Sequence, residues 1–314
     1  MIAQRGKAMI QACLESVFAT GENSISREIL VIDNASTDGT AEYLHSLGHR
    51  VTVLRNASKE SFSQNNNLAA NAARGEYLCF LGDDTVVAEG WLEKMVSTQR
   101  HDPRIGLVGN RHLDPDTGRI RHAGMVFSAD GRPLVLYTKQ PPDFWPALIN
   151  QEFQILSAAC WLLRRHLFLE MGGFDTDFVN GWGTIDFCLR VRQRGYKCFY
   201  VAESVIYRAS IPIPEALGHE ARDWDLFRCK WGMAITPDIA TFYAGPDPIP
   251  EPVRIFEVED VLEPPPSADT RSHIETRYGH VEALHHKHPW IASLLRAIIR
   301  LTTSVAKLLN RATS

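Results

Sequence analysis

Glu28-Ile-Leu-Val-Ile-Asp33 is a short aliphatic run that ends in an acid, and the turn residues Asn34-Ala-Ser-Thr-Asp-Gly39 follow it. A continuous apolar run closed by turn residues is typical of a buried parallel strand. Glu76-Tyr-Leu-Cys-Phe-Leu81 has the same form and ends in Gly82-Asp-Asp-Thr85. Further strands are predicted at 51–54, 105–109 and 196–201, and helices at 8–20, 38–47, 62–74, 89–98, 164–172 and 184–194. This alternation predicts an α/β fold with a doubly wound, mostly parallel sheet.

Acids stand at the ends of two of these strands, namely Asp33 on one and the pair Asp83 and Asp84 on the other. In an open α/β sheet, ligands bind beyond the carboxyl ends of the strands, so we expect these acids to line one crevice. Adjacent carboxylates there suit a hard divalent cation that holds a diphosphate. The alternative is that the acidic turn only caps the helix that follows it.

Composition narrows the classes of function. The 314 residues are 45% hydrophobic and 22% charged, as in an ordinary soluble protein, and the net charge of -4 gives no reason to expect nucleic acid as a partner. The six cysteines form no C-x-x-C pair, which argues against a zinc site and against a secreted disulfide scaffold. The N-terminus lacks a signal-peptide pattern, and no apolar run is long enough to span a membrane, so a cytoplasmic location is expected.

The chain is predicted to divide into a ligand-binding half at 1–110, a second half of the same domain at 111–244, a Pro-rich linker at 245–269 and a helical tail at 270–314. Within the tail, residues 290–311 form an amphipathic pattern with basic residues opposite the apolar side. Such a helix can lie peripherally on the inner face of an anionic membrane, or it can pack on the domain or in a dimer.

The motifs of residues 8–235 resemble, in order and spacing, family 2 glycosyltransferases, and the rhamnosyltransferase-like branch most of all. The central matches are Val31-Ile-Asp-Asn-Ala-Ser-Thr-Asp-Gly-Thr40, the segment 75–87 with its acidic turn, and Gly181-Trp-Gly-Thr-Ile-Asp-Phe-Cys-Leu-Arg190. Further matches lie at 12–16, 90–92, 119–127, 157–165, 171–175 and 194–196.

The resemblance implies a GT-A fold and an inverting glycosyltransferase that acts in cell-surface polysaccharide biosynthesis. Its donor would be a nucleoside-diphosphate sugar, and its acceptor a saccharide or a lipid-linked saccharide. Asp33, with Asn34 and Ser36, would bind the donor, while Asp83 and Asp84 would hold Mn²⁺ or Mg²⁺ on the diphosphate. Trp182 would either stack against the acceptor or lie buried.

The sequence departs from the family at four places. The opening strand is missing, because the chain is interpreted to begin at the following helix. The first ligand position of the D-x-D site is Gly82. The catalytic base position is Thr184, whose hydroxyl cannot serve as a base near neutral pH but can cap the helix. Arg208 replaces a histidine metal ligand and could instead bind a phosphate of the donor.

These departures leave two functions open. Asp186, two residues beyond the lost base, is either a substitute base or a first-turn acid that the helix dipole favours. The chain is therefore predicted to be an active glycosyltransferase, or else a degenerate or truncated homologue that binds a partner or glycan as a scaffold.

Overall fold

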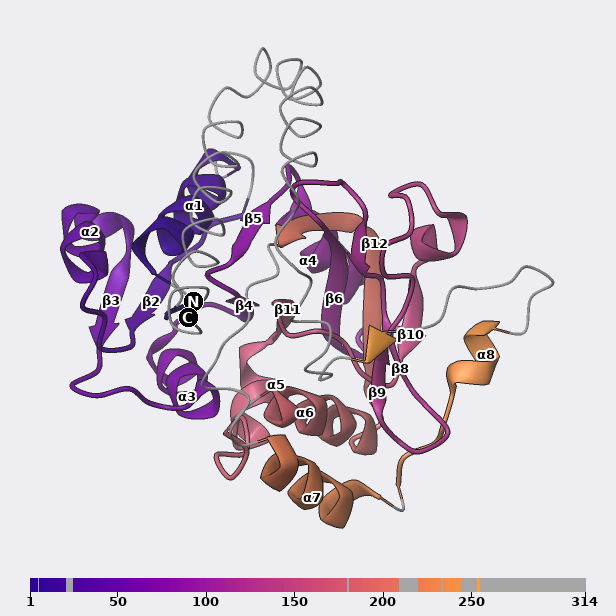
Figure 1. Cartoon of the computed structure of the whole chain (residues 1–314). Helices are drawn as coiled ribbons and strands as arrows, with labels where there is room; N and C mark the ends of the chain where they lie inside the picture. Colours follow the sequence, from indigo (N-terminus) through magenta and orange to yellow (C-terminus); the bar gives the residue numbers. More distant parts are fainter. Residues whose placement is uncertain are drawn as a thin grey trace, which may run out of the picture. The chain divides into compact units, whose positions relative to one another are not determined.

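The computed structural model describes residues 1–4, 6–20, 25–179, 181–208, 220–232, 234–243 and 253–254 (Figure 1). All of them belong to one compact unit, which comprises Met1–Arg208 and Ile213–Phe256. Among these residues, none of the helices combines the length and the apolar character that crossing a membrane requires.

The predictions for the C-terminal region lie mostly outside the described residues. The basic amphipathic helix at 290–311, with the rest of the predicted tail, is one of these. Of the predicted linker at 245–269, only 253–254 are described.

The first sheet consists of three parallel strands, β1 (Ile2–Ala3), β2 (Leu30–Asp33) and β3 (Thr52–Arg55). The presence of β1 corrects the interpretation that the chain begins at the helix after the opening strand, because Ile2 pairs with Ile32 and Ala3 pairs with Asp33. Two residues are too few for hydrophobic alternation to reveal a strand. The sheet packs against α1 (Lys7–Ala19) and α2 (Thr40–Ser46), and the short η1 (Gly48–Arg50) leads into β3.

The second sheet is mixed and has the order β10-β12-β6-β11-β4, with β5 paired to β12 and β7 paired to β6. Its strands are β4 (Tyr77–Leu81), β5 (Thr85–Val87), β6 (Ile105–Leu113), β7 (Ile120–His122), β10 (Gln151–Phe153), β11 (Cys160–Arg164) and β12 (Lys197–Arg208). Both β4 and β6 run antiparallel to β11, and β12 runs parallel to β6. The long strands β4, β6 and β12 therefore share one direction, as the α/β pattern predicts.

Helices cover both faces of this second sheet. They are α3 (Phe62–Ala72), α4 (Trp91–His101), α5 (Arg165–Glu170), α6 (Trp182–Gln193), α7 (Glu220–Trp231) and α8 (Ile239–Tyr243). Successive residues of β11 point to opposite faces: Trp161 joins the core formed with α3, α5, α6 and α7, whereas Leu162 joins the core formed with α1 and α4. Burial on both faces explains why β11 reads as a continuous apolar run.

A third, antiparallel sheet has the order β13-β9-β8, with β8 (Met125–Phe127), β9 (Pro133–Val135) and β13 (Val253–Arg254). Gly124 precedes β8 with a φ of 113°, and a Cβ added there would lie 2.2 Å from the ring of Phe153. Only glycine suits both the backbone angle and the close ring. The loop after β9 contains η2 (Trp145–Leu148).

The first two sheets meet where the site lies. After β1, the Gln4 amide donates a 2.9 Å hydrogen bond to Oδ2 of Asp83, which follows β4. Since Ala3 pairs with Asp33, the carboxyl ends of β1, β2 and β4 lie at the same edge.

Candidate active site

Asp33, the last residue of β2, is completely buried. Its Oδ1 accepts a 2.9 Å hydrogen bond from the Ser36 amide, which turns the loop back over the strand end. Its Oδ2 lies 3.5 Å from Nε of Arg55, and within the described residues this buried oxygen has no hydrogen-bond partner. A buried carboxylate oxygen without a partner costs about 1–3 kcal/mol. A ligand N–H could satisfy it.

Asn34 has a different environment from the one predicted. Its Oδ1 accepts hydrogen bonds from the Glu60 amide at 2.9 Å and from Nδ2 of Asn56 at 2.8 Å. Its Nδ2 donates to the Glu60 carbonyl at 3.0 Å. The side chain that was predicted to bind the donor therefore holds the loop after β3 against the end of β2. Ser36 contributes its backbone amide to Asp33.

The acidic turn after β4 contains Asp83 and Asp84, both buried. Asp84 Oδ2 accepts a 3.0 Å hydrogen bond from Nε of Arg208, whose side chain is 33% exposed. The antiparallel pairing of β12 with β5 explains the contact, because it places Arg208 opposite Thr85. The structure thus pairs Arg208 with Asp84 and links Asp33 to Asp83 through Ala3 and Gln4. The sequence predicted a shared crevice for the three acids, but it did not predict the pairing of Arg208 with Asp84.

These residues do not fit the divalent-cation site that the resemblance implies. Asp84 is already paired with the Arg208 guanidinium, and Asp83 accepts the Gln4 amide. An aspartate at position 82 would require the Asp84 side chain to move, because a Cβ on Gly82 would lie 2.6 Å from its Oδ1. In the described part of the chain, no three His, Cys, Asp or Glu side chains form a group that could hold a metal ion.

Thr184, at the family's base position, is buried near the start of α6. Its hydroxyl donates a 2.6 Å hydrogen bond to the Gly181 carbonyl. The described start of α6 has Gly181 as its N-cap and no capping bond from a side chain, which corrects the prediction that the Thr184 hydroxyl caps the helix. The neighbouring Gly183 is tightly packed, since a Cβ there would lie 3.0 Å from Oγ of Ser63.

Asp186 is completely buried and fully engaged with three side chains. Its Oδ2 accepts a 2.8 Å bond from Nε of Arg190, one turn along α6. Its Oδ1 lies 2.7 Å from Nζ of Lys230 and 2.9 Å from Nε1 of Trp231, both on α7. The structure therefore contradicts the substitute-base interpretation, because this carboxylate binds α7 to α6 and has no open side. The alternative prediction, in which Asp186 interacts only with the helix dipole, is also incomplete, because Asp186 forms an i, i+4 ion pair with Arg190.

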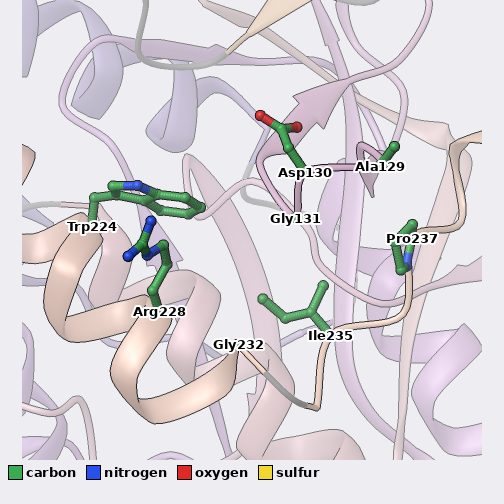
Figure 2. A pocket seen from close by; sticks show the side chains of 8 residues that line it. All are labelled: Ala129, Asp130, Gly131, Trp224, Arg228, Gly232, Ile235 and Pro237. Carbon is green, nitrogen blue, oxygen red and sulfur yellow. The ribbon is translucent and has the colours of Figure 1, made fainter.

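Trp182 is 1% exposed, so it lies in the core and cannot stack against an acceptor. Its ring packs against Trp224 at 5.1 Å and Phe227 at 4.8 Å between centroids. Trp224 in turn lines a cavity of about 300 Å³. Figure 2 shows Arg228 beneath the Trp224 indole and Asp130 across the cavity from it.

The sequence analysis did not predict two residues of the site and one residue that lines the cavity. Gln4 acts through its backbone amide, which leaves no side-chain signal. Arg55 could have been found, because it is paired in register with Asp33 on the neighbouring parallel strand. Trp224 belongs to a stretch with no assigned element in the sequence interpretation.

Residues 1–172 match the family model described as Glycosyl transferase family 2. The chain is 31% identical over 220 residues to the uncharacterized protein y4gI of Sinorhizobium fredii, a match that covers 65% of this chain and 24% of that protein. It is 24% identical over 233 residues to the N-acetylglucosaminyl-diphospho-decaprenol L-rhamnosyltransferase of Mycobacterium tuberculosis, with 68% of this chain and 72% of that protein covered. The chain thus spans less than a quarter of the length of y4gI.

Among solved structures, the fold is similar to that of GalNAc-T7, whose crystal structure contains UDP, GalNAc and Mn²⁺. The TM-score is 0.57 at 17% sequence identity, and the match covers 77% of this chain and 53% of that chain. At this identity the likeness concerns the fold, and it confirms the predicted GT-A type α/β architecture.

Proposed function

The chain belongs to glycosyl transferase family 2, and on that premise we propose that it transfers a sugar from a nucleoside-diphosphate sugar to a saccharide or lipid-linked acceptor. One observation carries the proposal: Asp33 and the acidic turn with Asp83 and Asp84 lie at one edge, linked through Ala3 and Gln4. The M. tuberculosis relative is named for a lipid-linked acceptor. Such an acceptor would place this chain at the inner face of a membrane, in cell-surface polysaccharide biosynthesis.

Asp33 would recognise the nucleobase. Its Oδ2 is buried without a hydrogen-bond partner in the described structure and has only the Arg55 ion pair at 3.5 Å, so an N–H of a base would supply the hydrogen bond it lacks. Uracil, thymine and guanine each present a ring N–H, whereas cytosine presents a bare ring nitrogen at the corresponding place. We therefore expect UDP, dTDP or GDP to bind more tightly than CDP.

The diphosphate would lie by the acidic turn, near Arg208. The negative charge of the diphosphate would be neutralised either by Arg208 or by Mn²⁺ or Mg²⁺ bound to Asp83 and Asp84. The pairing of Asp84 with Arg208 argues against the metal. In an inverting transfer a base removes the proton of the acceptor hydroxyl. Neither Thr184 nor Asp186 provides one, because both are engaged with protein groups.

That engagement supports a second candidate, a homologue that binds the donor but no longer transfers the sugar. The two candidates share the nucleotide site and differ at the start of α6. Sugar transfer, measured as nucleoside diphosphate released in the presence of an acceptor, distinguishes them once donor binding is established.

The test of the shared site is calorimetric titration of UDP, GDP, dTDP and CDP into wild type, Asp33→Asn and the exposed-surface control Glu170→Gln. In Asp33→Asn the oxygen can still accept the Ser36 amide, but the second carboxylate oxygen is replaced by an N–H₂ donor. A hydrogen bond to a charged group contributes about 1.5–3 kcal/mol, so affinity should fall at least about tenfold. Equal binding by wild type and Asp33→Asn would remove the nucleobase assignment.

A further inference from the structure

The position of Arg208 follows from the sheet. Arg208 is the last residue of β12 and pairs in register with Thr85, immediately after the acidic turn. The pairing of β12 with β5 therefore fixes the backbone of Arg208 beside the acidic turn, within reach of Asp84. The Nε–Oδ2 distance of 3.0 Å is that of a charge-assisted hydrogen bond.

The pair combines a buried acid with an accessible base. The Asp84 side chain is 1% exposed, whereas that of Arg208 is 33% exposed. A guanidinium has five N–H donors in a fixed planar fork, and the bond to Asp84 uses only Nε. The terminal Nη groups have the geometry to bind two phosphate oxygens side by side.

Asp84 fixes the orientation of this fork. A carboxylate bound at Nε holds the guanidinium plane and reduces the side-chain entropy that is lost when a ligand binds. A divalent cation at the same carboxylate would have to displace the guanidinium or tolerate its positive charge nearby. Gly82 provides no carboxylate to compensate for that repulsion.

We propose that Arg208, oriented by Asp84, binds the diphosphate of the donor in place of a divalent cation, so that donor binding does not require metal. This inference rests on the proposed function, because it concerns the same nucleotide site. Asp84 is then a positioning residue, and Arg208 is the group that contacts the phosphates.

The experiment is calorimetric titration of the full chain with UDP, GDP and dTDP, in excess EDTA and in Mn²⁺. The variant is Arg208→Gln. Its control is Arg121→Gln, because Arg121 has nearly the same exposure, 34%, and is likewise paired with an aspartate, Asp114. Circular dichroism and urea midpoints identify any variant that fails to fold.

We expect the dissociation constant of the preferred nucleotide to be the same within about twofold in EDTA and in Mn²⁺. We also expect Arg208→Gln to weaken binding at least about tenfold in EDTA, a loss of about 1.4 kcal/mol or more, while Arg121→Gln leaves it unchanged. Binding that requires Mn²⁺, or that survives Arg208→Gln in EDTA, would overturn the inference and leave the proposed function standing. Absence of binding under every condition would overturn both.

Asp84→Asn provides a second, independent variant. If Arg208 supplies the charge and Asp84 only orients it, removal of the carboxylate should weaken nucleotide binding less than Arg208→Gln does, and by the same factor in EDTA and in Mn²⁺. If two carboxylates hold a cation, the same substitution should weaken nucleotide binding in Mn²⁺. Weaker binding confined to the Mn²⁺ titration would therefore count against the role of Arg208.

Discussion

Asp186→Asn tests the connection between α6 and α7. The wild-type carboxylate accepts hydrogen bonds from Arg190 at 2.8 Å and Trp231 at 2.9 Å, and it lies 2.7 Å from Nζ of Lys230. Lys230 also contacts Asp175 at 2.7 Å. Burial lowers the pKa of Lys230, but the two aspartates outweigh this effect, so the pKa lies above its ordinary value and the ammonium stays charged. The substitution preserves shape and removes the negative charge between two cations.

The expected cost follows from the exposure of the three side chains. Removing one partner of a buried ion pair typically costs 3–5 kcal/mol. Arg190 is 19% exposed and Lys230 is 34% exposed, so water can solvate part of the charge that remains. We therefore expect the lower end, about 3 kcal/mol, which corresponds to about 5 °C in Tm at an unfolding entropy of about 2.1 cal/mol/K per residue.

The assay is urea unfolding followed by circular dichroism, with Glu152→Gln as the control. Glu152, on β10, pairs with Arg192, which lies on α6 like Asp186. The side chains of Glu152 and Arg192 are 39% and 33% exposed, so loss of this pair should cost less than about 1 kcal/mol. The reasoning fails if Asp186→Asn changes the free energy of unfolding by no more than the control does. Transfer activity lost at wild-type stability and with intact donor binding would instead make Asp186 a base.

Three further predictions concern the core. Gly124→Ala should destabilise the fold by about 3 kcal/mol or more, through the clash with Phe153 and the strained backbone, whereas Gly118→Ala, with open space around it, should cost only about 1 kcal/mol in the same urea experiment. Burial lowers the pKa of His122 to about 3, so the unfolded chain binds a proton that the folded chain does not. His122 should therefore contribute a fall in stability of about 1.6 kcal/mol between pH 6.5 and 5, in addition to the fall that buried His112 causes, and equal pH slopes for wild type and His122→Gln would contradict this. Trp182→Ala should cost about 3–5 kcal/mol of stability, while a change only in acceptor affinity would restore the stacking role.

The strands were predictable because each buried run carries its own signal. Residues 29–32 and 77–81 are almost entirely apolar, and acids follow each run at Asp33 and at Asp83 and Asp84; the structure places β2 and β4 at these runs. The rule that ligands bind beyond the carboxyl ends of the strands placed Asp33 on the same side as Asp83 and Asp84, and the structure links them through Ala3 and Gln4. The strand β1 could not be predicted from hydrophobic periodicity, because it has only two residues. Its presence means that the opening strand is not missing, which was one of the four predicted departures from the family.

The roles of individual side chains were less accessible, because they depend on partners far away in the sequence. Asp186 looked like an isolated first-turn acid, yet two of its partners lie on α7, 44 and 45 residues further on. Trp182 could not be assigned to core or surface until Trp224 and Phe227 were seen to cover it. Sequence spacing predicts the backbone position of such residues but not the side chains that arrive beside them.

The separation of 124 positions between Asp84 and Arg208 in the sequence has a consequence for biosynthesis. A nascent chain that has emerged from the ribosome only as far as α6 contains Asp84 but not Arg208, with which Asp84 pairs. Under the proposed nucleotide-binding role, nucleotide added during refolding would have its complete recognition surface only after β12 has been incorporated, and it would stabilise that final species by mass action. Protection by nucleotide against a protease would accordingly serve as a reporter for the last stage of assembly.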